Sequence, residues 1–227
     1  MMIALAGLLA YLLGAFPTGY LVGRFVGRFD VREHGSGSTG ATNVARKLGF
    51  GWAAVVMAVD VGKGALAVLL ARALGTGVPG EALAGLAAVI GHNWPVYLQF
   101  RGGRGVATGI GTVLVVMWEV GAGGLAAWVL AVALTRYVSL GSVLGVGVGL
   151  VVGLVSLVTG ARPWETAVYL VVGSAIIIAR HRDNIMRILA GAEHKLGQPA
   201  PQGGAPASGP EASRSPRPQT RSDSESR

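Results

Sequence analysis

The sequence contains no cysteine and few charged side chains. Among its 227 residues, Asp, Glu, Lys and Arg together account for 13%, about half the usual share in a globular protein. The absence of thiols excludes a disulfide framework, a thiolate nucleophile, cysteine-ligated zinc and an iron–sulfur cluster. The shortage of charge argues against a water-soluble globular enzyme, because a soluble domain of this size needs more charge on its surface.

Acidic residues and histidines are scarce as well, with 11 Asp and Glu and 4 His in the whole chain. Glu81, Glu119 and Glu165 lie at the ends of apolar runs and show no metal-ligand or paired-carboxylate spacing. We therefore expect neither a metal ion nor a cofactor.

Apolar residues and glycine dominate what is present. AVILMFWYC residues make up 52% of the chain, 37 residues are glycine, and the mean hydropathy is +0.55. The formal net charge is +8, but the basic residues separate apolar runs instead of forming one patch. This pattern is typical of a membrane protein that faces anionic lipid or a phosphorylated substrate, and it does not favour nucleic-acid binding.

Seven apolar runs are candidate membrane spans, at 1–23, 52–74, 82–100, 106–118, 121–134, 143–159 and 164–179. The first precedes the first basic residue, the reverse of a signal peptide, so we expect it to be retained with the N-terminus outside. The fourth and fifth are short and could form a re-entrant pair. The sequence predicts an all-α, polytopic transmembrane helix bundle with about seven spans, or five, and a cytoplasmic C-terminus.

Charge supports this topology. The predicted topology places twelve basic residues in the cytoplasmic segments and two, Arg72 and Arg162, outside, which is the expected positive-inside bias. After residue 197 the sequence becomes rich in Pro, Gly and Ser without apolar periodicity. We therefore expect a membrane domain at 1–197 and a disordered cytoplasmic tail at 198–227.

The first of four polar clusters, at 34–49, has the sequence HGSGSTGATNVARKLG. Its hydroxyls, amide and glycines, followed by Arg46, suit the binding of an anion near a helix N-terminus. It is not a Walker A loop, since no GK[ST] follows the glycines, and a plain flexible loop is the alternative. The candidate anion-binding residues here are Ser36, Gly37, Ser38, Gly40, Thr42, Asn43 and Arg46.

The second cluster, at 91–109, has the sequence GHNWPVYLQFRGGRGVATG. Arginine can hold a phosphate through two parallel hydrogen bonds, and glycines let backbone N–H groups approach the same anion. Two topology-setting arginines around a glycine turn are the alternative. The candidates are Arg101, Gly102, Gly103, Arg104 and Gly105. His92 is a polar contact within the bundle, a structural histidine or a proton carrier, and we favour the first two.

The third and fourth clusters lie at later inner boundaries. Ser139 and Ser142, in TRYVSLGSV at 135–143, are either polar site residues or helix caps. The segment ARHRDNIMRILAGAEHKLG, from 179, contains His181, Asn184 and Glu193. Its spacing places His181 and Asn184 on neighbouring positions of one helix, and a basic interfacial helix is the alternative.

One ion pair is expected inside the membrane. Asp60 and Lys63 lie three residues apart in MAVDVGKGA, a spacing that lets their side chains meet on one helix. An unpaired charge at this depth is costly. The pair is either purely structural or placed so that Lys63 also reaches an anionic ligand.

These motifs occur in one order, and together they resemble a known family. GSGSTGATNVAR, DVGKG, GHNWPVYLQFRGGRGVATG, YVSLGS and HRDNIMRILAGAEHKLG are similar in order and approximate spacing to the bacterial acyl-phosphate:glycerol-3-phosphate acyltransferases. The resemblance covers residues 1 to about 197. It implies a multi-pass enzyme of the bacterial inner (cytoplasmic) membrane, with its active site on the cytoplasmic side.

The resemblance also implies a reaction. An acyl phosphate would donate its chain to the 1-hydroxyl of glycerol 3-phosphate, giving 1-acylglycerol 3-phosphate (lysophosphatidic acid) and phosphate in the first acylation step of phospholipid synthesis. The enzyme that supplies acyl phosphate is a further candidate partner, besides membrane lipid.

By position, the family's catalytic and essential residues correspond to Ser36, Arg46, Arg104, His181 and Asn184, while Glu193 corresponds to a residue that is mainly structural. The chain departs from the family where relatives show SGNxGATN and GGKG, since it has Ser38 and Arg104 there. Phosphate recognition should survive both changes.

The reaction needs no covalent nucleophile, because an acyl phosphate is an activated mixed anhydride. We expect binding and positioning of two anions to dominate. Either His181 or a substrate phosphate would accept the hydroxyl proton, and the resemblance favours the phosphate. A membrane transporter for a phosphorylated solute is the competing function, and a non-catalytic scaffold that binds anionic lipid is a third.

Overall fold

The computed structural model describes residues 1–198, and this part consists of helices joined by short segments, without a strand. The predicted all-helical fold is therefore confirmed for these residues. The predicted tail at 198–227 lies, apart from Gln198, outside the described residues. The elements are α1 (Met2–Gly14), α2 (Thr18–Val22), η1 (Gly23–Gly27), η2 (Val31–Glu33), α3 (Ala41–Ala73), α4 (Gly77–Asn93), η3 (Val96–Leu98), α5 (Val106–Val116), α6 (Trp118–Thr135), α7 (Val138–Val158), α8 (Glu165–Arg180) and α9 (Arg182–Leu189).

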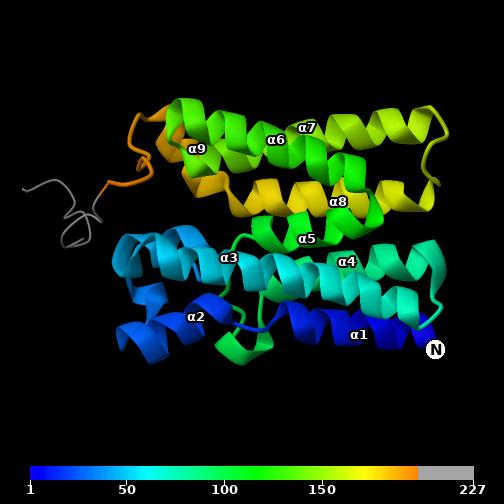
Figure 1. Cartoon of the computed structure of the whole chain (residues 1–227), viewed down its shortest axis with the longest axis horizontal. Coiled ribbons are helices and arrows are strands. Elements are labelled where there is room, and N and C mark those ends of the chain that lie inside the picture. Colours follow the sequence, from blue (N-terminus) through cyan, green and yellow to red (C-terminus); the bar gives the residue numbers. More distant parts are fainter. Residues whose placement is uncertain (199–227) are drawn as a thin grey trace, which may run out of the picture.

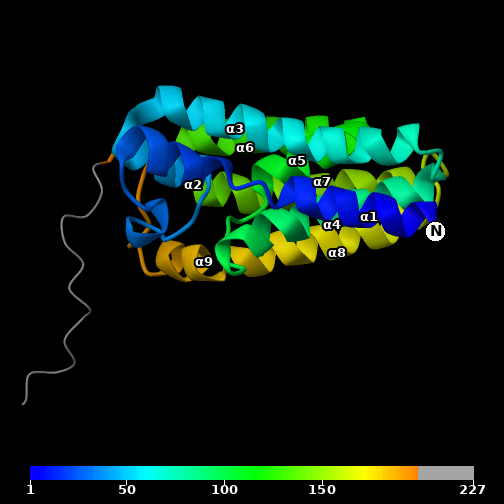
Figure 2. The same ribbon diagram turned by 90° about the horizontal axis from the view of Figure 1, so that it is seen from below.

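Successive long helices run in alternating directions along one elongated bundle (Figure 1). α1 packs along α4, α3 along α5 and α6 along α7, while α8 contacts both α4 and α7. The N-terminus lies at one end of the bundle, and α2, α9 and the α6–α7 turn lie at the opposite end, in both views (Figures 1 and 2). We call the latter the α9 end. All four polar clusters of the sequence are located toward it.

Small residues let these helices approach closely. Alanines of α1, α3 and α4 form one buried cluster, which includes Ala10 and Ala88. At Gly91 of α4, a Cβ atom would overlap the backbone carbonyl of Tyr11 in α1. Close backbone packing through Gly and Ala is how helices associate in lipid, where no hydrophobic effect drives helices together.

Helix breaks shift several predicted boundaries. The first apolar run breaks after α1, before the Pro17 that precedes α2. α3 begins at Ala41, well before the predicted start at 52, and kinks at Gly49, where φ is 81°. The fourth and fifth runs form separate helices because Met117, with φ −144° and ψ 77°, interrupts them.

Length and composition qualify four segments of the described part as candidate membrane spans: Met2–Gly27, Ala41–Ala73, Trp118–Thr135 and Val138–Val158. α5 has 11 residues and extends about 16 Å, roughly half the hydrocarbon thickness of a bilayer. The count of about seven spans, and the orientation of the termini, therefore stay predictions.

The outer faces of the helices are apolar. Leu134 is 76% exposed, Val151 and Leu130 are each 61% exposed, and Leu66 is 53% exposed. Apolar surface on this scale is unusual for a soluble monomer and suits contact with lipid. The described chain has the architecture of a multi-pass membrane protein.

Candidate functional site

A cavity of about 110 Å³ opens at the α9 end of the bundle. Its walls come from the segment before α3, from α3, α4, α5, α6 and α7, and from residues on both sides of α9. Predicted site residues make up much of its lining: Ser36, Ser38, Gly40, Thr42, Asn43, Arg46, Arg104, Gly105, Ser142 and His181. Segments separated by as many as 158 residues in sequence, from Ser36 to His194, thus meet around one space.

Two guanidinium groups face this cavity without a protein partner. Within residues 1–198, neither the Arg46 nor the Arg104 side chain makes a hydrogen bond or an ion pair, although both are partly buried. Burial and the nearby charge of Arg187 lower the pKa of Arg104 to about 10. Arg104 therefore stays protonated at neutral pH, and an anion between the two groups would compensate both.

Asn43 organises the loop before α3. Its Nδ2 lies 2.9 Å from the carbonyl oxygens of Val31 and Ser38 and 3.0 Å from that of His34, while its Oδ1 accepts the N–H of Ser36 at 3.2 Å. The amide is 3% exposed. It thus shapes the loop that presents Ser36 and Ser38 to the cavity.

The glycine segment before α5 is fixed from two sides. Gly103 packs on the imidazole of His92, so closely that a Cβ atom would overlap the ring. Arg180 donates two hydrogen bonds to the carbonyl of Gly103, at 3.0 and 3.2 Å, and stacks on Trp94 at 5.5 Å. Gly105 has φ +83°, a backbone conformation that favours glycine, and it turns the chain into α5 directly after Arg104.

Glu193 joins the segment after α9 to α7 and α9. Its carboxylate accepts hydrogen bonds from Ser139 at 2.9 Å, Asn184 at 2.8 Å and Arg187 at 2.7 Å. Burial by itself raises the pKa of Glu193, but these bonds more than offset it and the pKa is lowered. Asn184 donates to Glu193 and does not line the cavity, and its buried Oδ1 has no partner in the described part.

His181, between α8 and α9, faces the cavity with one ring nitrogen free. Its Nδ1 lies 2.8 Å from the carbonyl oxygen of Ile177, which can only accept, so Nδ1 carries the proton and Nε2 is unprotonated in the neutral ring. Burial lowers the pKa of His181 to about 4. The ring is therefore neutral at pH 7.

The ion pair of α3 lies deeper in the bundle. Lys63 Nζ is 2.8 Å from Asp60 Oδ1 and donates to the carbonyl of Phe16 at 2.9 Å. Thr18 donates to the same carboxylate at 3.0 Å, and His92 Nδ1 lies 3.7 Å from it. Lys63 does not line the cavity, so the structure favours the structural alternative for this lysine.

Some predicted residues stay outside the cavity lining: Gly37, Lys63, Arg101, Gly102, Gly103 and Asn184. Others line it or support it without having been predicted, namely Met57, Trp128, His194 and Arg180. Sequence reasoning counted Arg180 only as a topological charge, and its position directly before His181 was the signal that could have singled it out. In residues 1–198 no three His, Asp or Glu side chains gather as metal ligands.

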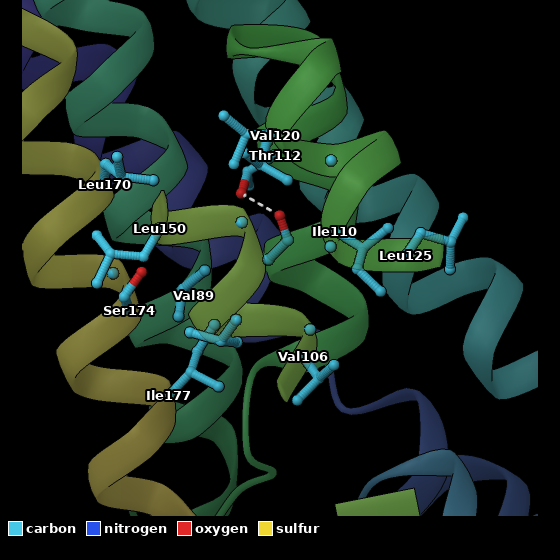
Figure 3. Close-up of a pocket in the computed structure, with 18 of the residues that line it drawn as sticks. Val89, Val106, Ile110, Thr112, Val120, Leu125, Leu150, Leu170, Ser174 and Ile177 are labelled. Carbon is cyan, nitrogen blue, oxygen red and sulfur yellow. Dashed lines mark hydrogen bonds between the residues drawn. The ribbon is translucent and has the colours of Figure 1, made fainter. Parts of the chain in front are cut away.

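A second, largely apolar cavity of about 90 Å³ lies between α5, α6, α7 and α8 (Figure 3). It shares the lining residues Val106, Ile110, Leu125, Trp128 and Ser142 with the polar cavity, so the two cavities are adjacent. In the close-up, Val106 and Ile177 lie at one end and Thr112 and Val120 at the other (Figure 3). Together the cavities offer cationic groups beside a space for an apolar chain.

Comparison with known proteins gives consistent results. The family described as glycerol-3-phosphate acyltransferase matches residues 4–191. A protein of Synechococcus sp. (strain CC9902) with this name is 50% identical over 190 residues, which cover 84% of this chain and 93% of the relative. A protein of the same name from Thermoanaerobacter pseudethanolicus (strain ATCC 33223 / 39E) is 42% identical over 197 residues, which cover 86% of this chain and 96% of the relative.

The fold is similar to a crystal structure of PlsY (YgiH), an integral membrane glycerol 3-phosphate acyltransferase, in its glycerol 3-phosphate form. The TM-score is 0.80 at 36% identity, covering 87% of this chain and 96% of that one. Its lysophosphatidic acid form gives a TM-score of 0.77 at 35% identity. By its sequence, its bundle and its five ordered motifs, the chain belongs to the glycerol-3-phosphate acyltransferase family.

Proposed function

We propose that the protein transfers an acyl chain from an acyl phosphate to the 1-hydroxyl of glycerol 3-phosphate, giving 1-acylglycerol 3-phosphate and phosphate. One observation carries the proposal: two guanidinium groups without side-chain partners in residues 1–198, Arg46 and Arg104, face a cavity that lies next to an apolar one. The relatives' name, and the two ligand forms of the PlsY structure, support the same substrate and product.

In the proposed reaction, the 1-hydroxyl oxygen attacks the acyl carbonyl carbon, and the bond from that carbon to the phosphate oxygen breaks. Both substrates carry a phosphate, so the site must hold two anions close together. Arg46 and Arg104 would neutralise them, and the N–H and hydroxyl groups of the Ser36 loop would complete their hydrogen bonds. The same groups would stabilise the charge that moves to the leaving phosphate.

The acyl chain would occupy the apolar cavity between α5 and α8. The reacting carbonyl would then lie near Ser142 and Val106, which line both cavities. Burying the chain among helices keeps its methylenes out of water while the phosphate stays with the arginines.

Two groups could accept the hydroxyl proton. His181 Nε2 is free and the ring is neutral at pH 7, but a pKa of about 4 makes it a weak base. A phosphate monoester, with its second pKa near about 6, is the stronger candidate. If phosphate is the base, kcat/KM rises through about pH 6 in the parent and in His181→Gln alike. An inflection near pH 4 that is present in the parent and absent from His181→Gln would assign the proton to His181.

We place the α9 end, with all motif segments, on the cytoplasmic side of the bacterial inner membrane, and residues 1–197 in one acyltransferase domain. The basic asymmetry of the segments and the family match over residues 4–191 support this. Because the chain has no cysteine, Ser38→Cys can be tested alone. It should react with an impermeant thiol reagent only after cells are permeabilised, and labelling in sealed cells would contradict the orientation.

The deciding experiment uses purified protein in detergent with glycerol 3-phosphate and either palmitoyl phosphate or palmitoyl-CoA. We expect phosphate release and an equal amount of 1-palmitoylglycerol 3-phosphate from the acyl phosphate, and little product from the acyl-CoA. A transporter or a lipid-binding scaffold would form no product from either donor. Efficient turnover of palmitoyl-CoA would overturn the donor assignment and keep the acyltransferase activity.

A further inference from the structure

We propose that the carboxylate of Glu193 is an internal competitor of the substrate phosphate, and that two positioning residues, Ser139 and Arg187, hold it away from the cavity arginines. Released from them, this carboxylate would pair with Arg46 or Arg104 in place of a phosphate. The proposal rests on the proposed function, since it takes phosphate as the ligand of the two arginines. It gives the hydrogen bonds of Glu193 a consequence for substrate binding, beyond joining α7 to α9.

Glu193 is well placed to compete. Within residues 1–198, the lining of the polar cavity contains two carboxylates, those of Asp60 and Glu193, and Asp60 is already paired within α3. Burial and the charge of Arg187 lower the pKa of Arg104 to about 10, while the charge of Glu193 acts in the opposite direction. The carboxylate therefore attracts Arg104 electrostatically. In the described residues, however, it forms its ion pair with Arg187.

Three donors fix the Glu193 carboxylate in this position. Its Oε1 accepts hydrogen bonds from Ser139 Oγ at 2.9 Å and from Asn184 Nδ2 at 2.8 Å. Its Oε2 accepts from Arg187 Nε at 2.7 Å. A carboxylate offers about four acceptor positions, so these donors fill most of them, and the side chain is only 4% exposed. A move toward the cavity arginines would break all three bonds.

Local geometry after α9 brings Glu193 to two of these donors. Gly191 has φ +66°, a backbone conformation that favours glycine, and it turns the chain back at the end of the helix. The N–H of Ala192 then donates to the carbonyl of Arg187 at 2.8 Å. Asn184 and Arg187 are three residues apart on α9, so both side chains can reach the returning carboxylate.

Release of the carboxylate would matter because it belongs to the same chain as the arginines. Groups joined by a short flexible segment meet at an effective concentration on the order of millimolar. This equals or exceeds the usual KM of an enzyme for its substrate, roughly 1 μM to 1 mM. A carboxylate also binds a guanidinium through two parallel hydrogen bonds, as a phosphate does. A released Glu193 should therefore raise the KM for glycerol 3-phosphate and leave kcat largely unchanged, since excess substrate displaces it.

The test compares single variants with double variants that also carry Glu193→Gln. The readout is KM and kcat for glycerol 3-phosphate at a fixed concentration of palmitoyl phosphate. Arg187→Met removes the charged donor and should raise KM about tenfold, with kcat within about threefold of the parent. Ser139→Ala removes a neutral donor and should raise KM about threefold. Adding Glu193→Gln to either variant should return KM to within about twofold of the parent, because a neutral amide competes poorly for a guanidinium.

Controls separate this competition from other causes. Arg182→Met, on the same helix, removes a side chain that is 84% exposed and pairs with Asp183, and it should leave KM unchanged. Ser139→Ala changes no charge, so its reversal by Glu193→Gln excludes a mere change of electrostatic potential at the arginines. If Arg187→Met does not fold, Ser139→Ala carries the test alone. Thermal stabilisation of each variant by glycerol 3-phosphate, without a donor, measures binding independently of turnover.

The outcomes separate the two proposals. A rise in KM that Glu193→Gln reverses, in Ser139→Ala as in Arg187→Met, supports the competition. An unchanged KM in Ser139→Ala, or a rise that Glu193→Gln does not reverse, overturns it and leaves the proposed function standing. If no donor reacts but the stabilisation by glycerol 3-phosphate weakens and recovers in the same pattern, the proposed function fails and the competition stands. Without turnover and without such a pattern in the stabilisation, both fail.

Discussion

The bundle contains one buried cation, Lys63, and two partly buried ones, Arg46 and Arg104, and they differ in how their charge is compensated. Lys63, whose side chain is 4% exposed, meets Asp60 at 2.8 Å and the carbonyl of Phe16. Arg46 and Arg104 face the polar cavity without a protein anion or acceptor in the described part of the chain. The charge of Lys63 is neutralised within the protein, whereas Arg46 and Arg104 need an anion from a ligand to neutralise theirs.

The difference separates structure from function. A buried charge that is paired within the protein links the segments that carry the partners. Here the Asp60–Lys63 pair of α3 forms hydrogen bonds with Phe16 and Thr18, which lie at the break between α1 and α2. A buried charge that is unpaired reduces stability until a ligand neutralises it. At the N-terminal end of the bundle, Arg72 and Arg162 are more exposed and are also paired within the protein, with Glu81 and Glu119. Removing each kind of charge should therefore have opposite consequences.

The largest effect should be on stability, when one member of the Asp60–Lys63 ion pair is removed. Lys63→Met leaves the Asp60 carboxylate buried without a counter-charge and should cost about 3–5 kcal/mol in the free energy of unfolding. Adding Asp60→Asn should recover most of the loss. Unfolding of the purified protein in detergent measures both, and a loss of Lys63→Met below about 1 kcal/mol would mean that the pair behaves as a solvated one.

The next effect is on activity. Arg46→Ala and Arg104→Ala should each reduce acyl transfer by a factor on the order of ten to several hundred, because a charge-assisted hydrogen bond contributes about 1.5–3 kcal/mol and a bidentate contact more. Stability should hold or rise, unlike in Lys63→Met. Arg104→Lys should retain more activity than Arg104→Ala, since a point charge still binds phosphate. Near-normal turnover in both alanine variants would remove these residues from the site.

A smaller effect should follow from loosening the segment that carries Arg104. Arg180→Gln removes the charged donor to the Gly103 carbonyl and should raise the KM for glycerol 3-phosphate about tenfold, with a smaller change in kcat. Arg180→Lys should restore part of the loss. Arg182→Gln is the control, because this neighbouring side chain is 84% exposed and pairs only with Asp183. Equal KM values in the two Gln variants would contradict the positioning role of Arg180.

The smallest effect concerns pH and Glu193. Its folded pKa is lowered, so its carboxylate stabilises the fold above the unfolded pKa of about 4.3 and loses this contribution as pH falls through the lower folded pKa. Glu193→Gln keeps an acceptor oxygen and should cost about 1 kcal/mol at neutral pH. The difference between parent and variant should shrink toward about pH 3. A difference that grew in acid would contradict the sign of the shift.

Much of the fold could be predicted because its signals are local. Long apolar runs predict helices wherever they occur in the chain, and the breaks at Pro17 and Gly49 have local causes. The predicted start of α3 at 52 is too late, because its first turns, from Ala41, carry polar residues that an apolar run does not include. The fourth apolar run, predicted as short at 106–118, agrees with α5 to within two residues.

The candidate site was predicted in part for the same reason. Glycines, hydroxyls and arginines in one segment indicate anion binding, and their presence in several segments suggested a shared site. The sequence could not show that the Asn43 amide bonds to the backbone of the loop before α3. Nor could it show that Asn184 donates a hydrogen bond to Glu193, or that Arg180 donates to the Gly103 carbonyl. Each of these contacts depends on where a side chain points, which composition does not record.

The sequence by itself determined the class of protein, the helices and the family, since these follow from hydropathy, residue type and the order of motifs. Only the tertiary structure decided which charges are neutralised. Lys63 and Arg104 are both basic residues beside glycine, and the sequence made both candidates for phosphate binding while leaving a purely structural pair open for Lys63. They differ because Asp60 and the Phe16 carbonyl lie within 3 Å of Lys63. Electrostatic compensation falls with distance in space, and only the fold sets the distances between segments far apart in the chain.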